Sequence, residues 1–185
     1  NQADRRRVNM AMKTIRPIRV EGNVAFVPLT KGYEAVIDAV DVPLVDGRRW
    51  FATVIRRRDG SIYTVYATRT DVSDGRKHNV HMHRVIVSNA HGLDVDHING
   101  TGLDNRRANL RAVTRSQNLM NRGPNAGSHS GMKGVHWLAR TGRWYAQIKA
   151  GGQRRHLGYF DTIEGAAEAY RKASIEMHGE FGRTN

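Results

Sequence analysis

Alternating apolar positions on both sides of a turn pair predict a β-hairpin over residues 48–69. The pair Asp59-Gly60 separates two runs in which every second side chain is apolar or β-branched. A period of two residues is typical of a strand with one buried face, and Asp-Gly is a common hairpin turn. The alternating positions are Trp50, Ala52 and Val54 on the first strand and Ile62, Thr64 and Tyr66 on the return strand.

A second pattern begins near Gly134. Residues 134–160 predict three short strands with turns at Thr141-Gly142 and Gly151-Gly152. Residues 161–181 predict a helix, in which Asp161 and Glu164 have the spacing of a capping box. We expect Tyr145, Ile148, Leu157 and Phe160 to pack as core against its apolar face, formed by Ile163, Ala166, Ala167, Tyr170, Ala173 and Met177.

The remaining segments complete an α+β chain. Residues 23–45 mix short β-type runs with turns, residues 80–90 predict a strand or a short helix, and residues 121–134 are rich in Gly, Ser, Asn and Pro. We therefore predict a basic arm over 1–22, a first domain over 23–122, a linker over 123–131 and a second domain over 132–185. The first residue is Asn, so Met10 and Met12 are candidate initiators and "DRRR" (Asp4–Arg7) carries little weight.

Composition narrows the partners. The 185 residues carry a net charge of +13, and the pI is near 10.8. A protein this basic is expected to bind a polyanion. A ribosomal-type or merely well-solvated basic protein has the same charge. The absence of cysteine excludes disulfides and thiolate zinc sites. We expect an intracellular protein, in the cytoplasm of a bacterial host if a phage encodes it, because no apolar run spans a membrane and no signal peptide is present.

Charge is segregated within residues 133–180. The strand region 133–160 contains six Lys or Arg and no acid, whereas residues 161–180 contain five acids and two bases. A sheet that packs one face on the helix leaves its other face free, with Arg, Lys, Trp and Gln side chains suited to DNA phosphates and base edges. A solvated basic sheet without a ligand is the simpler alternative, but exposed Trp beside Arg favours a partner.

The segment 95–118, "VDHINGTGLDNRRANLRAVTRSQN", places a carboxylate and an imidazole side by side at Asp96 and His97. Asn109 and Asn118 follow, the latter on a predicted helix. An Asp and Asn pair is a hard oxygen site that suits Mg²⁺ or Mn²⁺, and an adjacent His can accept a proton from water. Together these groups fit phosphodiester hydrolysis. On spacing alone, a polar, turn-rich loop with a satisfied histidine is equally compatible.

The same residues resemble HNH endonucleases of the phage and homing type. The matching pattern is DH-I-N-G, then DNR, NLR and a final QN before N-R, with "HMHRVI" (residues 81–86) and "VPLTKGYEAVIDAVD" (residues 27–41) upstream. Residues 133–185 resemble the Apetala-type DNA-binding domain of ethylene-response factors. Both resemblances together cover about residues 23–185. They imply a ββα-metal nuclease core, preceded by a β-hairpin region and followed by a three-stranded antiparallel sheet packed on one helix.

The resemblance also implies residue roles. His97 is the general base, Asp96 ligates one divalent metal, and Asn109 braces the loop that carries His97. Asn118 stands where the family name has its final His and becomes the second metal ligand, which favours Mg²⁺ over zinc or nickel. His83 is a further catalytic candidate that positions phosphate or supports the core, while His78 and His81 are expected bystanders. Candidate phosphate contacts are Arg84, Arg106, Arg107, Arg111 and Arg115.

For the second domain, the resemblance places the DNA-reading side chains on the three strands, with about half of the candidates facing the groove. Among them, Arg143 and Gln147 have the chemistry for bidentate base contacts. The candidates are His136, Trp137, Arg140, Arg143, Trp144, Gln147, Lys149, Arg154 and Arg155.

These observations predict a Mg²⁺-dependent DNA endonuclease that acts on double-stranded DNA as a monomer and nicks one strand, because one base and one metal make one active site. A DNA-binding regulator with a non-catalytic HNH scaffold is the alternative. An RNA-binding protein is a third hypothesis, which the lack of aromatic-rich stacking motifs weakens.

Overall fold

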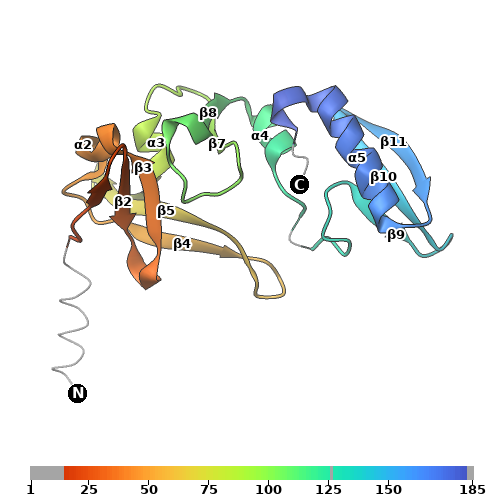
Figure 1. The fold of residues 1–185 in the computed structure, drawn as a ribbon, viewed down its shortest axis with the longest axis horizontal. Helices are drawn as coiled ribbons and strands as arrows, with labels where there is room; N and C mark the ends of the chain where they lie inside the picture. The colour runs from red at the N-terminus through yellow and green to blue at the C-terminus, as the bar shows by residue number, and fades with distance from the viewer. Residues whose placement is uncertain (1–14, 126, 183–185) are drawn as a thin grey trace, which may run out of the picture. The chain divides into compact units, whose positions relative to one another are not determined.

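The computed structural model describes residues 15–125 and 127–182, which form several small antiparallel sheets and short helices (Figure 1). The chain is therefore a mixed α and β protein. Its described residues form two compact units. The first contains the residues up to 55 and residues 64–112, and the second contains residues 56–63 and those from 113 onward.

Three sheets build the first unit. They have the strand orders β1-β2-β3, β4-β5-β6 and β7-β8. The strands are β1 (Arg19–Glu21), β2 (Val24–Pro28), β3 (Glu34–Asp38), β4 (Phe51–Arg56), β5 (Ile62–Ser73), β6 (Arg76–His81), β7 (Asp94–His97) and β8 (Leu110–Val113). Short helical turns connect them: η1 (Thr30–Gly32), η2 (Ala39–Asp41), α2 (Val42–Val45), α3 (Met82–Ile86) and η3 (Arg107–Asn109).

The predicted hairpin over residues 48–69 forms, but its return strand has the opposite phase. Trp50 and Ala52 are buried as expected. On β5, however, Val65 and Ala67 join the core, whereas Ile62 is 42% exposed. The side chain of Tyr66 instead packs against histidine rings. Around residues 65–67 both faces of β5 are covered, one by the core and the other by the histidine rings against Tyr66, so apolar alternation alone does not identify the core face.

Residues 80–90, predicted as a strand or a short helix, contain the end of a strand and then a short helix. The strand β6 ends at His81, and the helix α3 begins at Met82, which is fully buried. This junction matters for the site because it turns the chain between His81 and His83.

The second unit follows the predicted order of elements. Its elements are α4 (Arg115–Asn121), β9 (Val135–Leu138), β10 (Arg143–Ala150), β11 (Gln153–Phe160), α5 (Ile163–His178) and η4 (Gly179–Phe181). The three strands form an antiparallel sheet in the order β11-β10-β9, and α5 packs across it (Figure 1). Gly151 and Gly152 both have positive φ, of 58° and 80°, as the predicted turn requires.

The helix α5 buries the predicted face but begins with a different cap. Ala166, Tyr170 and Ala173 are buried against the sheet. The N-cap is Thr162, whose hydroxyl accepts a hydrogen bond from the backbone N–H of Gly165. The expected box between Asp161 and Glu164 is therefore wrong by one residue. A capping box does form at α4, between Thr114 and Gln117.

The predicted domain limits of 23–122 and 132–185 stay a prediction, since the compact units divide instead between residues 112 and 113. Most of the predicted basic arm, including Asp4–Arg7, lies outside the described residues. Among the described helices, none is long and apolar enough to cross a membrane.

Candidate nuclease site and sheet face

Asp96 and His97 are the last two residues of β7, where the chain leaves the two-stranded sheet β7-β8. Both residues are buried, with 8% and 6% of their surface exposed. The turn after them is closed by a hydrogen bond from Gly100 N to His97 O, and Gly100 has a φ of 74°. The loop over residues 98–109 then returns to β8.

Asn109 ties the two ends of this loop together. Its side-chain oxygen accepts a hydrogen bond from the backbone N–H of Asn99 at 3.0 Å, and its amide nitrogen donates to the backbone oxygen of Asp104 at 2.7 Å. The backbone N–H of Ile98 also donates to Asn109 O at 2.8 Å. Asn109 is itself 9% exposed. Its amide group therefore fixes the turn that directly follows His97.

A second set of contacts holds the loop to the first sheet. The backbone N–H of Asn105 donates to Val36 O at 2.7 Å, and that of Val36 donates to Leu103 O at 2.8 Å. Asn105 is fully buried. Its side-chain oxygen lies 3.4 Å from Nε2 of His97, and its amide nitrogen donates to Leu103 O.

His97 belongs to a cluster of rings that comes from three separate segments. His83 meets it edge to face, with ring centroids 4.8 Å apart, and Tyr66 packs at 5.9 Å. His81 stacks on His83 at 5.3 Å, and its Nδ1 lies 3.1 Å from the hydroxyl of Thr68. The ring of His81 thus forms one wall of the cluster, and its expected role as a bystander to the chemistry stays a prediction.

Burial keeps these imidazoles neutral. Desolvation lowers the pKa of His83 from 6.5 to about 2, with the nearby His97 and His81 contributing less. Desolvation also lowers the pKa of His97, although its contact with Asn105 and the carboxylate of Asp96 act in the opposite direction. The pKa of His81 is lowered by burial and by Arg84. A neutral His97 is able to accept a proton near neutral pH.

The carboxylate of Asp96 is paired with Arg111 on β8. Nε and Nη2 of Arg111 donate to Oδ2 of Asp96 at 3.1 and 3.0 Å. The side chains are 14% and 9% exposed, so this is a nearly buried ion pair. Any cation held by Asp96 therefore shares the carboxylate with a guanidinium group.

Three further predicted phosphate contacts also bind acids. Arg84 pairs with Asp94, Arg106 with Asp104, and Arg107 with the buried Asp41. The last pair links η3 to η2. Arg115 is the first residue of α4. The sequence could not separate phosphate contacts from internal ion pairs, because the partners of Arg107 lie more than sixty residues away in the chain.

The donor chemistry of Asp96 fits a hard cation, because carboxylate oxygen is the ligand that Mg²⁺ prefers. Asn118 lies on α4 in the second unit, so its pairing with Asp96 stays a prediction. Among residues 15–125 and 127–182, no group of three or more His, Asp or Glu side chains is arranged to hold a metal ion.

In the second unit, strand register divides the predicted DNA-reading side chains between two faces. Tyr145 pairs with His136, Gln147 with His156, and Lys149 with Arg154. Because side chains alternate along a strand, these residues share the face opposite α5. Of the predicted candidates, this outer face carries His136, Arg143, Gln147, Lys149 and Arg154.

The predicted core position of Tyr145 is wrong. It was expected in the core, but it stacks on His156 with ring centroids 5.1 Å apart and lies 5.7 Å from Tyr159 on the outer face. Its hydroxyl donates to the side-chain oxygen of Gln147 at 3.0 Å. The physical reason is alternation: Ala146 and Ile148 are buried against α5, so Tyr145 must face the other way.

Trp144 and Trp137 lie on the helix side of the sheet instead of its outer face. Trp144 packs against the core, and Trp137 meets it edge to face at 5.1 Å while remaining 44% exposed. Arg155 lies opposite the buried Ile148 in the strand register, so its side chain also lies on the helix side of the sheet. Arg140 lies in the turn after β9 and is exposed. The outer face instead includes two aromatic residues that the sequence reasoning missed, His156 and Tyr159.

Known proteins resemble separate parts of the chain. A family model described as HNH endonuclease matches residues 80–120. Protein 3.8 of Escherichia phage T7 is 32% identical over 92 residues, which are 50% of this chain and 75% of that protein. An uncharacterized HNH endonuclease of Acanthamoeba polyphaga mimivirus is 32% identical over 91 residues, 49% of this chain and 46% of that protein.

A third relative is a plant protein. APETALA2-like protein 2 of Oryza sativa subsp. indica is 45% identical over 58 residues, which are 31% of this chain and 13% of that protein. The chain thus spans most of the phage protein, about half of the mimivirus protein and about an eighth of the plant protein. No solved structure matches the chain.

The hairpin that carries Asp96, His97 and Asn109 falls inside the matched range of residues 80–120, so the chain carries an HNH endonuclease domain. More particularly, it belongs to the family that includes Protein 3.8 of Escherichia phage T7.

Proposed function

We propose that this protein is a metal-dependent endonuclease that hydrolyses one phosphodiester bond of double-stranded DNA. The observation that carries the proposal is the position of His97. Its imidazole is buried, kept neutral, adjacent to Asp96 and held on a turn that Asn109 fixes. These are the requirements of a general base beside a cation site.

In the proposed reaction, His97 accepts a proton from water, and the water oxygen attacks phosphorus as the bond to the 3′ oxygen breaks. Nδ1 is the proton acceptor that we favour. The amide nitrogen of Asn105 already donates to Leu103 O, so its oxygen faces Nε2 of His97 and favours the tautomer with hydrogen on Nε2. A divalent cation, Mg²⁺ or Mn²⁺, held by Asp96 and Asn118 would neutralise the phosphate and stabilise the leaving oxygen.

His83 acts as a positioning residue in this proposal. Its ring contacts His97 edge to face, and burial lowers its pKa to about 2, so the ring is uncharged near neutral pH and does not act as a general acid. It therefore orients the imidazole of His97 through packing.

The outer face of β9-β10-β11 supports binding to duplex DNA. Lys149 and Arg154 supply positive charge, whereas Arg143 shares its charge with Asp161, to which its Nε donates at 2.8 Å. The amide of Gln147 lies beside the ring of Tyr145, where it can meet a base edge. We propose that this face delivers the nuclease to its site. One base and one cation cut one strand, so a monomer produces nicks.

The decisive test is cleavage of supercoiled plasmid with Mg²⁺, with EDTA, and by His97→Ala. Open circles that require both the cation and His97 support the proposal. His78→Ala is the matched control, since His78 is exposed on β6 and outside the ring cluster. A library of phage genomic fragments replaces the plasmid where the target sequence is absent from it.

A DNA-binding regulator is the second candidate, and the Asp96–Arg111 ion pair favours it because the pair holds the carboxylate without any cation. The regulator predicts DNA binding with no cleavage of plasmid or library under any metal condition. Cleavage that survives His97→Ala would exclude both assignments and indicate another site.

A further inference from the structure

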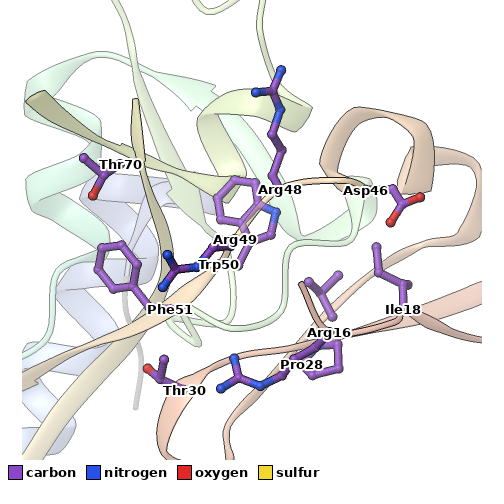
Figure 2. A pocket seen from close by; sticks show the side chains of 11 residues that line it. Arg16, Ile18, Pro28, Thr30, Asp46, Arg48, Arg49, Trp50, Phe51 and Thr70 are labelled. Carbon is purple, nitrogen blue, oxygen red and sulfur yellow. The ribbon is translucent and has the colours of Figure 1, made fainter. Parts of the chain in front are cut away.

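The first unit contains a cavity of about 360 Å³ that no residue of the Asp96 and His97 site lines. It lies between the end of β2, the segment before β4 and the strand β5 (Figure 2). Three of the side chains that line it are arginines, Arg16, Arg48 and Arg49, and Asp46 is the one acid among its lining residues. The cavity therefore has an excess of positive charge.

These arginines differ from most others in the unit. Within residues 15–125 and 127–182, no hydrogen bond or ion pair links Arg16, Arg48 or Arg49 to a carboxylate. Most of the remaining arginines of the first unit have an acid as partner: Arg19, Arg69, Arg84, Arg106, Arg107 and Arg111. Guanidinium groups that gather on one cavity and have no carboxylate partner are typical of an anion site, and the single acid of this lining, Asp46, is outnumbered by three arginines.

The cavity wall is held in place by internal hydrogen bonds. The indole N–H of Trp50 donates to Val45 O at 2.9 Å, and Trp50 is 4% exposed. The hydroxyl of Thr30 accepts a hydrogen bond from the backbone N–H of Ala52 at 3.1 Å. The hydroxyl hydrogen of Thr30 is thereby left to donate to a ligand. A rigid wall with one hydroxyl donor suits an oxyanion.

Figure 2 shows which groups reach the cavity. The side chains of Arg16 and Arg49 extend toward the space beside Thr30 and Phe51, whereas Arg48 extends away from it. Two guanidinium groups and a hydroxyl can surround the non-bridging oxygens of one phosphate, and the ring of Phe51 offers an apolar surface to the attached sugar.

We propose that this cavity binds a backbone phosphate of a DNA strand, as a contact separate from both the cleavage site and the outer face of the second unit. The proposal rests on the proposed function for the identity of the nucleic acid. A free phosphate or a mononucleotide has the same oxyanion chemistry, and the test separates these sources from a strand.

The test measures binding of the full chain to labelled duplex DNA by fluorescence anisotropy in EDTA, from about 50 to about 200 mM NaCl. Arg49→Gln is expected to weaken binding roughly three- to tenfold and to reduce the salt slope by about 1, as loss of one phosphate contact does. Arg16→Gln should act in the same direction. Thermal unfolding should not change, because neither guanidinium group has an internal carboxylate partner.

The matched control is Arg76→Gln. Arg76 is exposed at the start of β6, does not line the cavity, and its loss changes the net charge equally. Equal effects of Arg49→Gln and Arg76→Gln on affinity and slope would overturn the proposal. A second arm adds inorganic phosphate or a mononucleotide at constant ionic strength. Binding of either that needs Arg49, with an unchanged DNA salt slope, would assign the cavity to a free phosphate and also overturn it.

Because DNA binding is measured in EDTA, without a divalent cation, its result does not depend on whether the protein cleaves DNA. If the wild type binds DNA and Arg49 is dispensable, the cavity proposal fails while the nuclease proposal stands. If the wild type shows no cleavage, while Arg49 still contributes to DNA binding, the nuclease proposal fails and the cavity proposal stands.

Discussion

Arg111 donates two hydrogen bonds to a single oxygen of Asp96, at 3.0 and 3.1 Å, across the two-stranded sheet β7-β8. The carboxylate that the proposed reaction assigns to a cation is thus already neutralised by a guanidinium group. Arg111 therefore stabilises the carboxylate of Asp96 in the absence of a cation.

Replacement of Arg111 should make the stability of the nuclease unit depend more strongly on metal. In EDTA, Arg111→Gln is expected to lower the free energy of unfolding by about 3 kcal/mol, because a nearly buried carboxylate loses its cationic partner. Mg²⁺ or Mn²⁺ should restore part of this loss, and should stabilise the variant more than the wild type. Urea unfolding with EDTA and with each cation measures both effects.

Arg84→Gln is the control, since its pair with Asp94 is more exposed, at 46% and 23%, and its loss should cost under about 1 kcal/mol. An equal metal-dependent gain in wild type and Arg111→Gln would mean that the cation does not use Asp96.

The buried imidazole of His83 should make the fold sensitive to acid. Its pKa is about 2 in the folded protein and 6.5 when exposed, so the unfolded chain binds the extra proton below pH 6.5. The free energy of unfolding therefore falls as pH decreases from 6.5, by about 1.4 kcal/mol per pH unit for this one group. His83→Phe should remove that contribution and flatten the slope between about pH 5.5 and about pH 4.5.

The slope is obtained from urea unfolding at several pH values. His78→Phe serves as the control because His78 is exposed on the same strand that leads into α3. Identical slopes for the wild type and His83→Phe would show that His83 is protonated in the folded protein, in conflict with its burial.

The brace at Asn109 should be needed for activity beyond its effect on stability. Asn109→Ala leaves the backbone N–H of Asn99 and the backbone oxygen of Asp104 without their partners, at an expected cost of about 3 kcal/mol. Cleavage by the folded fraction should fall at least about 100-fold, because the turn that positions His97 loosens. Asn79→Ala, at an exposed position on β6, should change neither. A variant that loses stability but keeps its cleavage rate would reduce Asn109 to a structural residue.

The elements were predictable where one face of a strand or helix is buried and the other is not. The sheet β9-β10-β11 and the face of α5 that carries Tyr170 followed from periodicity and glycine turns. The face of Tyr145 was also predictable, because Ala146 and Ile148 are the positions that fit under a helix. The size of an aromatic side chain alone does not place it in the core, because alternation along the strand decides which face it takes.

The ring cluster was not predictable from the sequence. His81, His83, His97 and Tyr66 come from three segments, and they meet only because β5 pairs with β6 and α3 turns the chain toward β7. No local pattern encodes such a meeting. The HNH motif did point to the hairpin of Asp96, His97 and Asn109, because those residues are close in the chain and their spacing is set by one turn.

The last prediction concerns Gly134, where the stability of the second unit and its proposed DNA binding depend on the same residue. Its φ is 69°, and a Cβ there would overlap the backbone oxygen of Gln147 and the ring of Tyr170. Gly134→Ala should therefore destabilise this unit by more than about 3 kcal/mol, since neither backbone nor buried ring can move aside. Gly131→Ala has a similar φ of 66° but open space around it, and should cost about 1 kcal/mol. Gly134→Ala should lose stability and DNA binding together. The reason is that the backbone oxygen of Gly134 accepts a hydrogen bond from the backbone N–H of Gln147, whose side chain lies on the outer face. Equal stability of the two variants would contradict the packing of Tyr170 against β9 and β10.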